Sequence, residues 1–161
     1  MFVTAIITSS SDAKLARAAS LGATHTINYR TTPDWDEAVL RLTSNHGADI
    51  ILEVGGAGTL NKSFQCVAFG GLISAIGYLA GKQDNDAATR TNVNVLALAR
   101  TVTLKGIQNG PKDRFEEMLA LYKEKKIRPV VDRVFAFEQA KEGLQYLYGG
   151  SHFGKVVIKV A

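Results

Sequence analysis

Short apolar runs that alternate with helix-forming stretches constrain the fold of this chain more than any other feature. The runs are rich in β-branched residues, so we expect each strand to be buried on both faces. Strands of this kind form a parallel sheet that helices cover on either side. The expected strands are Val3–Thr8, His25–Tyr29, Asp49–Val54, Leu72–Ile76, Val102–Ile107, Val130–Phe135 and Lys155–Val160.

Helix formers and capping residues fill the segments between the strands. Gly22 stands where a helix terminus favours a left-handed residue, and Gly70-Gly71 is expected to break the chain before the fourth strand. The expected helices are Ala13–Leu21, Trp35–Leu42, Leu60–Val67, Val93–Ala99, Asp113–Lys125 and Phe137–Tyr148, and 81–92 is expected to be a surface loop. The sequence therefore predicts a doubly wound α/β fold in one domain over residues 1–161.

Composition excludes several classes of protein. The formal charge is +4, but the basic residues are scattered, so we expect no nucleic-acid partner. No apolar run approaches the roughly 20 residues of a membrane span, and the amino-terminal residues do not resemble a signal peptide. Cys66 is the only cysteine, which suits a reducing compartment. We expect a cytoplasmic protein without a membrane partner.

Four stretches occur in an order that points to one family. They are Thr8–Trp35 (TSSSDAKLARAASLGATHTINYRTTPDW), Gly47–Gly81 (GADIILEVGGAGTLNKSFQCVAFGGLISAIGYLAG), LKGIQNGPKDRFEEMLAL and IRPVVDRVFAFEQAKEGLQYLYGGSHFGKVVIKVA. Together they resemble the Rossmann-like coenzyme domain of medium-chain dehydrogenase/reductases, closest to the zinc-type alcohol dehydrogenase-like and quinone oxidoreductase-like branches. The resemblance covers essentially the whole sequence. It implies hydride transfer between NADPH and a small carbonyl or enone.

The resemblance also implies residues that contact the nucleotide. In such folds an acidic residue at the end of the second strand favours NAD, whereas Thr8-Ser9-Ser10 stands there without a carboxylate. Lys14 and Tyr29 resemble family positions that contact a 2′-phosphate, and hydroxyls and a cation suit that dianion. NADP(H) is therefore the expected cofactor. The alternative is that the serines only cap the helix and Lys14 only faces solvent.

Further cofactor contacts are expected where other strands end. Gly55, Gly56 and Gly77 follow strands at the carboxyl edge, where glycine allows a ligand to approach the backbone closely. Gly106 and Lys155 resemble family segments near the nicotinamide and the pyrophosphate. Plain turn chemistry is the alternative interpretation of the three strand-end glycines.

Two parts of the family pattern are not found in this sequence. The family domain begins with a strand and a GxGxxG turn, whereas the sequence matches it from the second strand onward, and the substrate domain is also unmatched. The expectation is a truncated domain in which NADP(H) binding is weakened. Because the absent strand is central to the family's sheet, its two neighbours must close up or another chain must fill the place. We therefore expect a homodimer, with Val102–Ile107 matching the strand through which the family commonly dimerises.

Catalytic groups are sparse. His25, His46 and His152 show no ligand spacing, so no zinc site is expected, and Cys66 reads as a small core residue. The weak catalytic candidates are Tyr78, Asn109, Asp49 and Glu53. A capping or fold-stabilising role is the alternative for Asp49, Glu53 and Tyr78.

Three functions remain open from the sequence. The first is an NADP-type oxidoreductase coenzyme domain or a remnant of one. The second is a redox-neutral enzyme, such as a cyclase, isomerase or dehydratase, that binds a small molecule in the vacated cofactor cleft. The third is a non-catalytic dimeric binding protein.

Overall fold

The computed structural model describes residues 3–83 and 92–160, which fall into two compact units. The first unit spans Met1–Gln108 and the second spans Asn109–Ala161. Each unit has its own helices and parallel strands, and each is described by itself. The sequence does not reveal this division, and the single domain expected over residues 1–161 stays a prediction.

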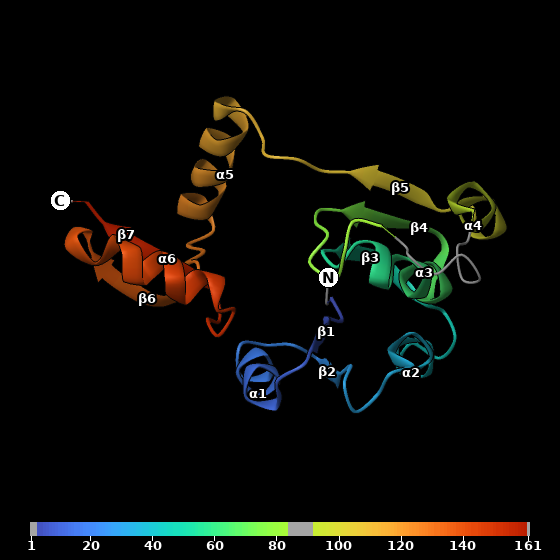
Figure 1. Ribbon diagram of the computed structural model, residues 1–161. Coiled ribbons are helices and arrows are strands. Elements are labelled where there is room, and N and C mark those ends of the chain that lie inside the picture. The colour runs from blue at the N-terminus through green and yellow to red at the C-terminus, as the bar shows by residue number, and fades with distance from the viewer. Residues whose placement is uncertain (1–2, 84–91, 161) are drawn as a thin grey trace. The chain divides into compact units, whose positions relative to one another are not determined.

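The elements of both units follow the expected alternation of strands and helices (Figure 1). The first unit contains β1 (Ile6–Ser9), α1 (Asp12–Ser20), β2 (His25–Asn28), α2 (Trp35–Leu42), β3 (Ala48–Glu53), α3 (Ala57–Cys66), β4 (Val67–Ala75), α4 (Val93–Arg100) and β5 (Thr103–Gly106). The second contains α5 (Lys112–Glu124), β6 (Val131–Ala136), a 3₁₀ turn (Phe137–Gln139), α6 (Ala140–Tyr148) and β7 (Lys155–Lys159). Most of the expected surface loop at 81–92 lies outside the described residues.

The strands form three parallel sheets. In the first unit β1 pairs with β2, and β4 lies between β3 and β5; in the second unit β6 pairs with β7. These parallel strands with intervening helices confirm the expected α/β class. Within the described residues β1 does not pair with β3, so the closing of the sheet that we considered is not found. Filling of that place by another chain stays a prediction.

β4 is longer than the sequence predicts. Gly70 and Gly71 do not precede the strand but lie inside it, where the pairing of β3 with β4 shifts register. Gly70 has φ +74°, which favours glycine, and a Cβ on Gly71 would lie 2.9 Å from the carbonyl oxygen of Ala68. The expected chain break was therefore wrong, because a bulge absorbs the irregular residues and the strand continues.

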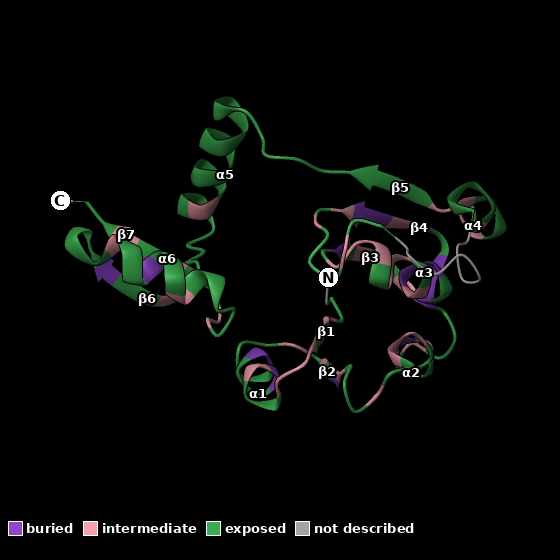
Figure 2. Ribbon diagram, in the orientation of Figure 1, coloured by how far each residue is buried: buried purple, intermediate pink, exposed green. Residues whose placement is uncertain are grey.

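One apolar cluster joins the two sheets of the first unit. Ile27, Val39 and Cys66 are buried together, with Ile6 of β1 and Ile51 of β3 packed against them. A second cluster of Phe64, Val67 and Ile73 lies under α4, which packs against it. Figure 2 shows buried residues of this unit on β4 and α3, with others on α1 and β2.

The opposite side of β3 is exposed. Ile51 contacts the core, whereas Ile50 and Leu52, which alternate with it along the strand, are 63% and 68% exposed. Burial on both faces was the expectation for this strand, whereas the described residues of the first unit bury only one face. The helices α2 and α3 pack against that face, and nothing among the described residues of this unit covers Ile50 and Leu52.

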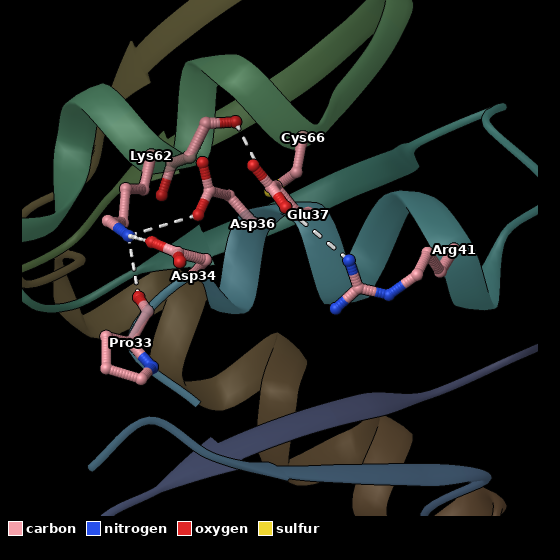
Figure 3. A network of polar contacts seen from close by, with 8 residues as sticks. Pro33, Asp34, Asp36, Glu37, Arg41, Lys62 and Cys66 are labelled. Carbon is pink, nitrogen blue, oxygen red and sulfur yellow. Dashed lines mark hydrogen bonds and ion pairs between the residues drawn. The ribbon is translucent and has the colours of Figure 1, made fainter. Parts of the chain in front are cut away.

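Lys62 fastens α3 to the start of α2 (Figure 3). Its ammonium group donates to the carbonyl oxygen of Pro33 at 2.6 Å and lies 3.3 Å from Asp34 and 3.2 Å from Asp36. Burial alone would lower the pKa of Lys62, but hydrogen bonds and attraction from Asp36 and Asp34 outweigh it and raise that pKa. The contact holds together the two helices that cover the shared core.

Candidate functional site

The carboxyl ends of β1 and β2 bring two predicted cofactor residues together. Ser9 lies opposite Asn28 in the parallel ladder, and the N–H of Tyr29 donates to the carbonyl oxygen of Ser9 at 3.1 Å. The side chain of Tyr29 is 44% exposed, while Ser9 is half-buried. The backbone hydrogen bond therefore fixes the spacing between a hydroxyl-bearing strand end and a phenol.

The first turn of α1 adds Lys14 to the same end of the sheet. Ser11 is the N-cap, and its hydroxyl oxygen accepts from the N–H of Lys14 at 3.4 Å. The hydroxyl oxygen of Ser9 accepts from the N–H of Ser11 at 3.3 Å, with Ser10 between them. Ser11, rather than Ser9 or Ser10, is the residue that caps the helix. Ser9 instead braces the turn that leads into it.

Sequence reasoning missed an acidic residue at this end of the sheet. Asn28 Nδ2 donates to Asp12 Oδ1 at 2.7 Å, which holds the carboxylate against the last residue of β2. No carboxylate was expected here because the strand end itself is Thr8-Ser9-Ser10. Asp12 stands in the first turn of the following helix, so an acidic residue at that turn was the only sequence signal.

A buried carboxylate organises the turn from β3 to α3. Glu53 is 5% exposed, and its Oε1 accepts from the N–H of Gly55 at 2.8 Å and of Gly56 at 3.1 Å. Oε1 also accepts from the Thr59 hydroxyl at 2.6 Å, and Oε2 accepts from the Ser63 hydroxyl. These four donors satisfy the buried carboxylate, and they support the fold-stabilising interpretation of Glu53.

The same carboxylate occupies the amino end of α3. Gly56 is the N-cap and has no side chain with which to cap the helix, so Glu53 takes the place that an anionic ligand would need. The carbonyl oxygens of Val54 and Gly55 also accept from the N–H groups of Leu79 and Ala80. Because the N–H groups of Gly55 and Gly56 both donate to Glu53, these two residues have no spare backbone donor for a pyrophosphate.

The turn after β4 packs tightly on the turn after β3. A Cβ on Gly77 would lie 2.9 Å from the carbonyl oxygen of Val54, so glycine is needed there for the fold itself. Tyr78 is 59% exposed, and the Lys82 ammonium lies 4.5 Å from its ring centroid. Gly106 ends β5 and is exposed, with open space where a Cβ would stand.

Asp49 is not brought together with these residues. It is near the amino end of β3, the opposite end from Glu53, and its carboxylate lies 2.9 Å from His46 Nε2. The catalytic role considered for Asp49 therefore receives no geometric support from the strand ends. Asn109 and Lys155 belong to the second unit, and the roles considered for them stay predictions.

The described residues contain neither a cluster of metal ligands nor an exposed thiol. Residues 3–83 and 92–160 contain no group of three or more His, Cys, Asp or Glu side chains that could hold a metal ion. Cys66 is 1% exposed, and burial, followed by the charge of Asp36, raises the pKa of its thiol to about 12. Cys66 is a core residue. No helix in the same ranges is long and apolar enough to cross a membrane.

Parallel strands that alternate with helices define an α/β protein with a Rossmann-like fold. The family model for zinc-binding dehydrogenases matches residues 21–158, so the chain belongs to that family. A zinc-type alcohol dehydrogenase-like protein from Schizosaccharomyces pombe is 43% identical over 96% of this chain and 44% of its own length. A 2-haloacrylate reductase from a Burkholderia species is 29% identical over 96% of this chain and 47% of its own length.

Solved structures agree with this assignment. The crystal structure of an NAD-dependent alcohol dehydrogenase superposes with a TM-score of 0.81 at 34% identity, covering 98% of this chain and 44% of that one. The resemblance to medium-chain dehydrogenase/reductases is confirmed. The chain spans less than half the length of these relatives.

Proposed function

We propose that this chain is the nucleotide-binding part of an NADP(H)-dependent oxidoreductase that acts on a small carbonyl or enone. The reaction class rests on family membership, and similar proteins carry names such as 2-haloacrylate reductase and alcohol dehydrogenase. When bound, the nicotinamide would supply or accept the hydride. The residues described above would bind and orient the nucleotide.

The junction of Ser9 with Tyr29 carries the nucleotide part of the proposal. The ladder of β1 and β2 sets the two residues side by side, and the cap at Ser11 begins the helix that bears Lys14. Hydroxyls and an ammonium group are suitable donors for a phosphate dianion. Ser9, Ser10, Lys14 and Tyr29 would thus hold the ribose 2′-phosphate.

The turn from β3 to α3, at the carboxyl edge of the second sheet, is expected to contribute less to nucleotide binding than the ends of β1 and β2. Because Glu53 takes the N–H groups of Gly55 and Gly56, that turn suits van der Waals contact with a nucleotide but not a hydrogen-bonded diphosphate. The affinity of the chain for the nucleotide would depend mainly on contacts with the 2′-phosphorylated ribose of its adenosine half. We therefore expect weak binding, in the range in which millimolar nucleotide saturates the site.

Calorimetric titration with 2′,5′-ADP and with 5′-AMP tests the proposal. We expect 2′,5′-ADP to bind more tightly, and Lys14→Met to weaken it by about tenfold while 5′-AMP changes little. Lys141→Met, which removes a lysine from α6 in the second unit, is the matched control and should leave both affinities unchanged. Absence of heat with millimolar concentrations of both nucleotides would contradict the proposal.

A further inference from the structure

The hydrogen bond between Asp12 and Asn28 places a negative charge at the proposed phosphate site. Asn28 is the last residue of β2 and lies opposite Ser9, and its neighbour Tyr29 donates to the Ser9 carbonyl oxygen. The Asp12 carboxylate, 2.7 Å from Asn28 Nδ2, is therefore held beside residues that the proposed function assigns to the 2′-phosphate. The groups expected to attract the phosphate and the carboxylate expected to repel it therefore lie at the same end of the sheet.

The side-chain amide of Asn28 is fixed from both sides. Its oxygen accepts from the N–H of Arg30 at 3.0 Å, and its nitrogen donates to Asp12. Because the backbone N–H can bond only the amide oxygen, the amide nitrogen is the group that faces the carboxylate. Asp12 is thus held in one place, unlike a carboxylate on a side chain that moves freely in solvent.

We propose that Asp12 is a specificity-determining residue, whose fixed charge limits the preference of this site for a 2′-phosphate. This inference rests on the proposed function. The carboxylate repels the phosphate dianion, and it can accept a hydrogen bond from a free ribose hydroxyl. The site accordingly takes nucleotides both with and without the 2′-phosphate, and Asp12 sets the ratio between them.

A purely structural role makes a different prediction. A carboxylate in the first turn of α1 also interacts favourably with the helix dipole. Loss of that interaction would lower the stability of the protein and would affect every nucleotide alike. Only a specificity role changes the ratio of two affinities.

Asp12→Asn separates the two roles, because asparagine keeps an acceptor for Asn28 and removes the charge. A single carboxylate charge near a dianion in a water-like dielectric, screened by physiological salt, predicts an effect of about two- to fivefold. We expect the ratio of the dissociation constants of 5′-AMP and 2′,5′-ADP to rise by that factor in calorimetric titrations. The gain should shrink as salt is added. Glu37→Gln, which removes a charge from the first turn of α2, should leave the ratio unchanged.

The outcomes distinguish this inference from the proposed function. If the wild type binds 2′,5′-ADP and the ratio is the same in Asp12→Asn, the specificity role is wrong and the proposed function survives. If the wild type binds neither nucleotide, the proposed function is wrong and the inference fails with it. Should Asp12→Asn not fold, Asn28→Ala releases the carboxylate without changing its charge. That variant should raise the ratio by about twofold, and an unchanged ratio there would also overturn the inference.

Discussion

The carboxylate of Glu53 accepts a hydrogen bond from the Thr59 hydroxyl at 2.6 Å, across the turn that joins β3 to α3. Thr59 lies in the first turn of α3, and Glu53 is the last residue of β3. The bond therefore ties the strand end to the helix start. A buried charge at this position is stable only while its donors remain.

We predict that Glu53→Gln destabilises the first unit by about 2–4 kcal/mol. Glutamine offers one acceptor oxygen in place of two, and its amide nitrogen would face the hydroxyl or N–H donors that now bond Glu53. Urea unfolding followed by circular dichroism measures the change. Glu37→Gln, at an exposed position of α2, is the control and should change stability by less than about 0.5 kcal/mol. Equal midpoints for the two variants would refute the role of Glu53.

Removal of the Lys62 contact should cost about 1 kcal/mol at neutral pH. Lys62→Met keeps most of the side-chain volume and deletes the hydrogen bond to the Pro33 carbonyl oxygen, together with the ion pairs to Asp34 and Asp36. The measurement is the difference between the unfolding free energies of wild type and variant.

The difference in unfolding free energy between wild type and Lys62→Met should depend on pH. The pKa of Lys62 is raised from its ordinary 10.5, so the charged form stabilises the fold fully below that pH. The stabilisation is lost as the pH rises through the folded-state pKa. The difference between wild type and Lys62→Met should thus be constant from neutral pH to about 9 and shrink above about 10.5. A difference that grows with alkalinity would contradict the assignment.

The Cys66 thiol should be unreactive in the folded protein. Its pKa is about 12 and its side chain is buried, so thiolate is scarce and shielded at pH 8. Labelling with a disulfide reagent should proceed only through unfolding and accelerate with urea. The raised pKa also means that its contribution to stability is complete below about 9 and is lost between about 9 and about 12. Stoichiometric labelling within seconds in native buffer would show that the site opens easily.

Substitution by alanine should destabilise the protein to different degrees at Gly22 and at Gly47. Gly22 has φ +105° and nothing within 4 Å of a Cβ, so Gly22→Ala bears only backbone strain, about 1–2 kcal/mol. Gly47 has φ +91°, and its Cβ would lie 2.8 Å from both the Ala68 nitrogen and the Cys66 oxygen. Gly47→Ala should therefore cost several kcal/mol more, as thermal unfolding of the two variants would show. Similar melting temperatures would mean that the α3–β4 backbone yields to the added methyl group.

Element types follow from local pattern, and those predictions were confirmed in both units. The apolar β-branched runs predict the strands, and Gly22 predicts the end of α1 through its positive φ. Gly70-Gly71 misled the prediction of β4 because a bulge and a turn favour the same residue, and only pairing with β3 distinguishes them.

The candidate site was predicted from strand ends and from the family resemblance, which supplied Lys14 and Tyr29, and nucleotide binding by these residues stays a prediction. The side-chain contacts at this end of the sheet were not predicted. The contact of Asp12 with Asn28 joins residues 16 positions apart, through side chains whose orientation no periodicity specifies. The occupation of the Gly55 and Gly56 N–H groups by Glu53 was likewise hidden, because an acidic residue before a glycine turn is equally compatible with a ligand site.

The unpaired edges of β1 and β3 lead to a prediction about assembly. Neither strand pairs on its second side within the described residues, and Ile50 and Leu52 of β3 are exposed. Exposed edges and apolar side chains favour association with another chain, so we expect a dimer at micromolar concentration. Leu52→Lys should shift sedimentation toward the monomer without unfolding the protein. Leu144→Lys, at a similarly exposed leucine of α6, should do so far less. A wild type that sediments as a clean monomer at this concentration would show that the open face of β3 is tolerated in water, and the expectation of a second chain at this edge would be wrong.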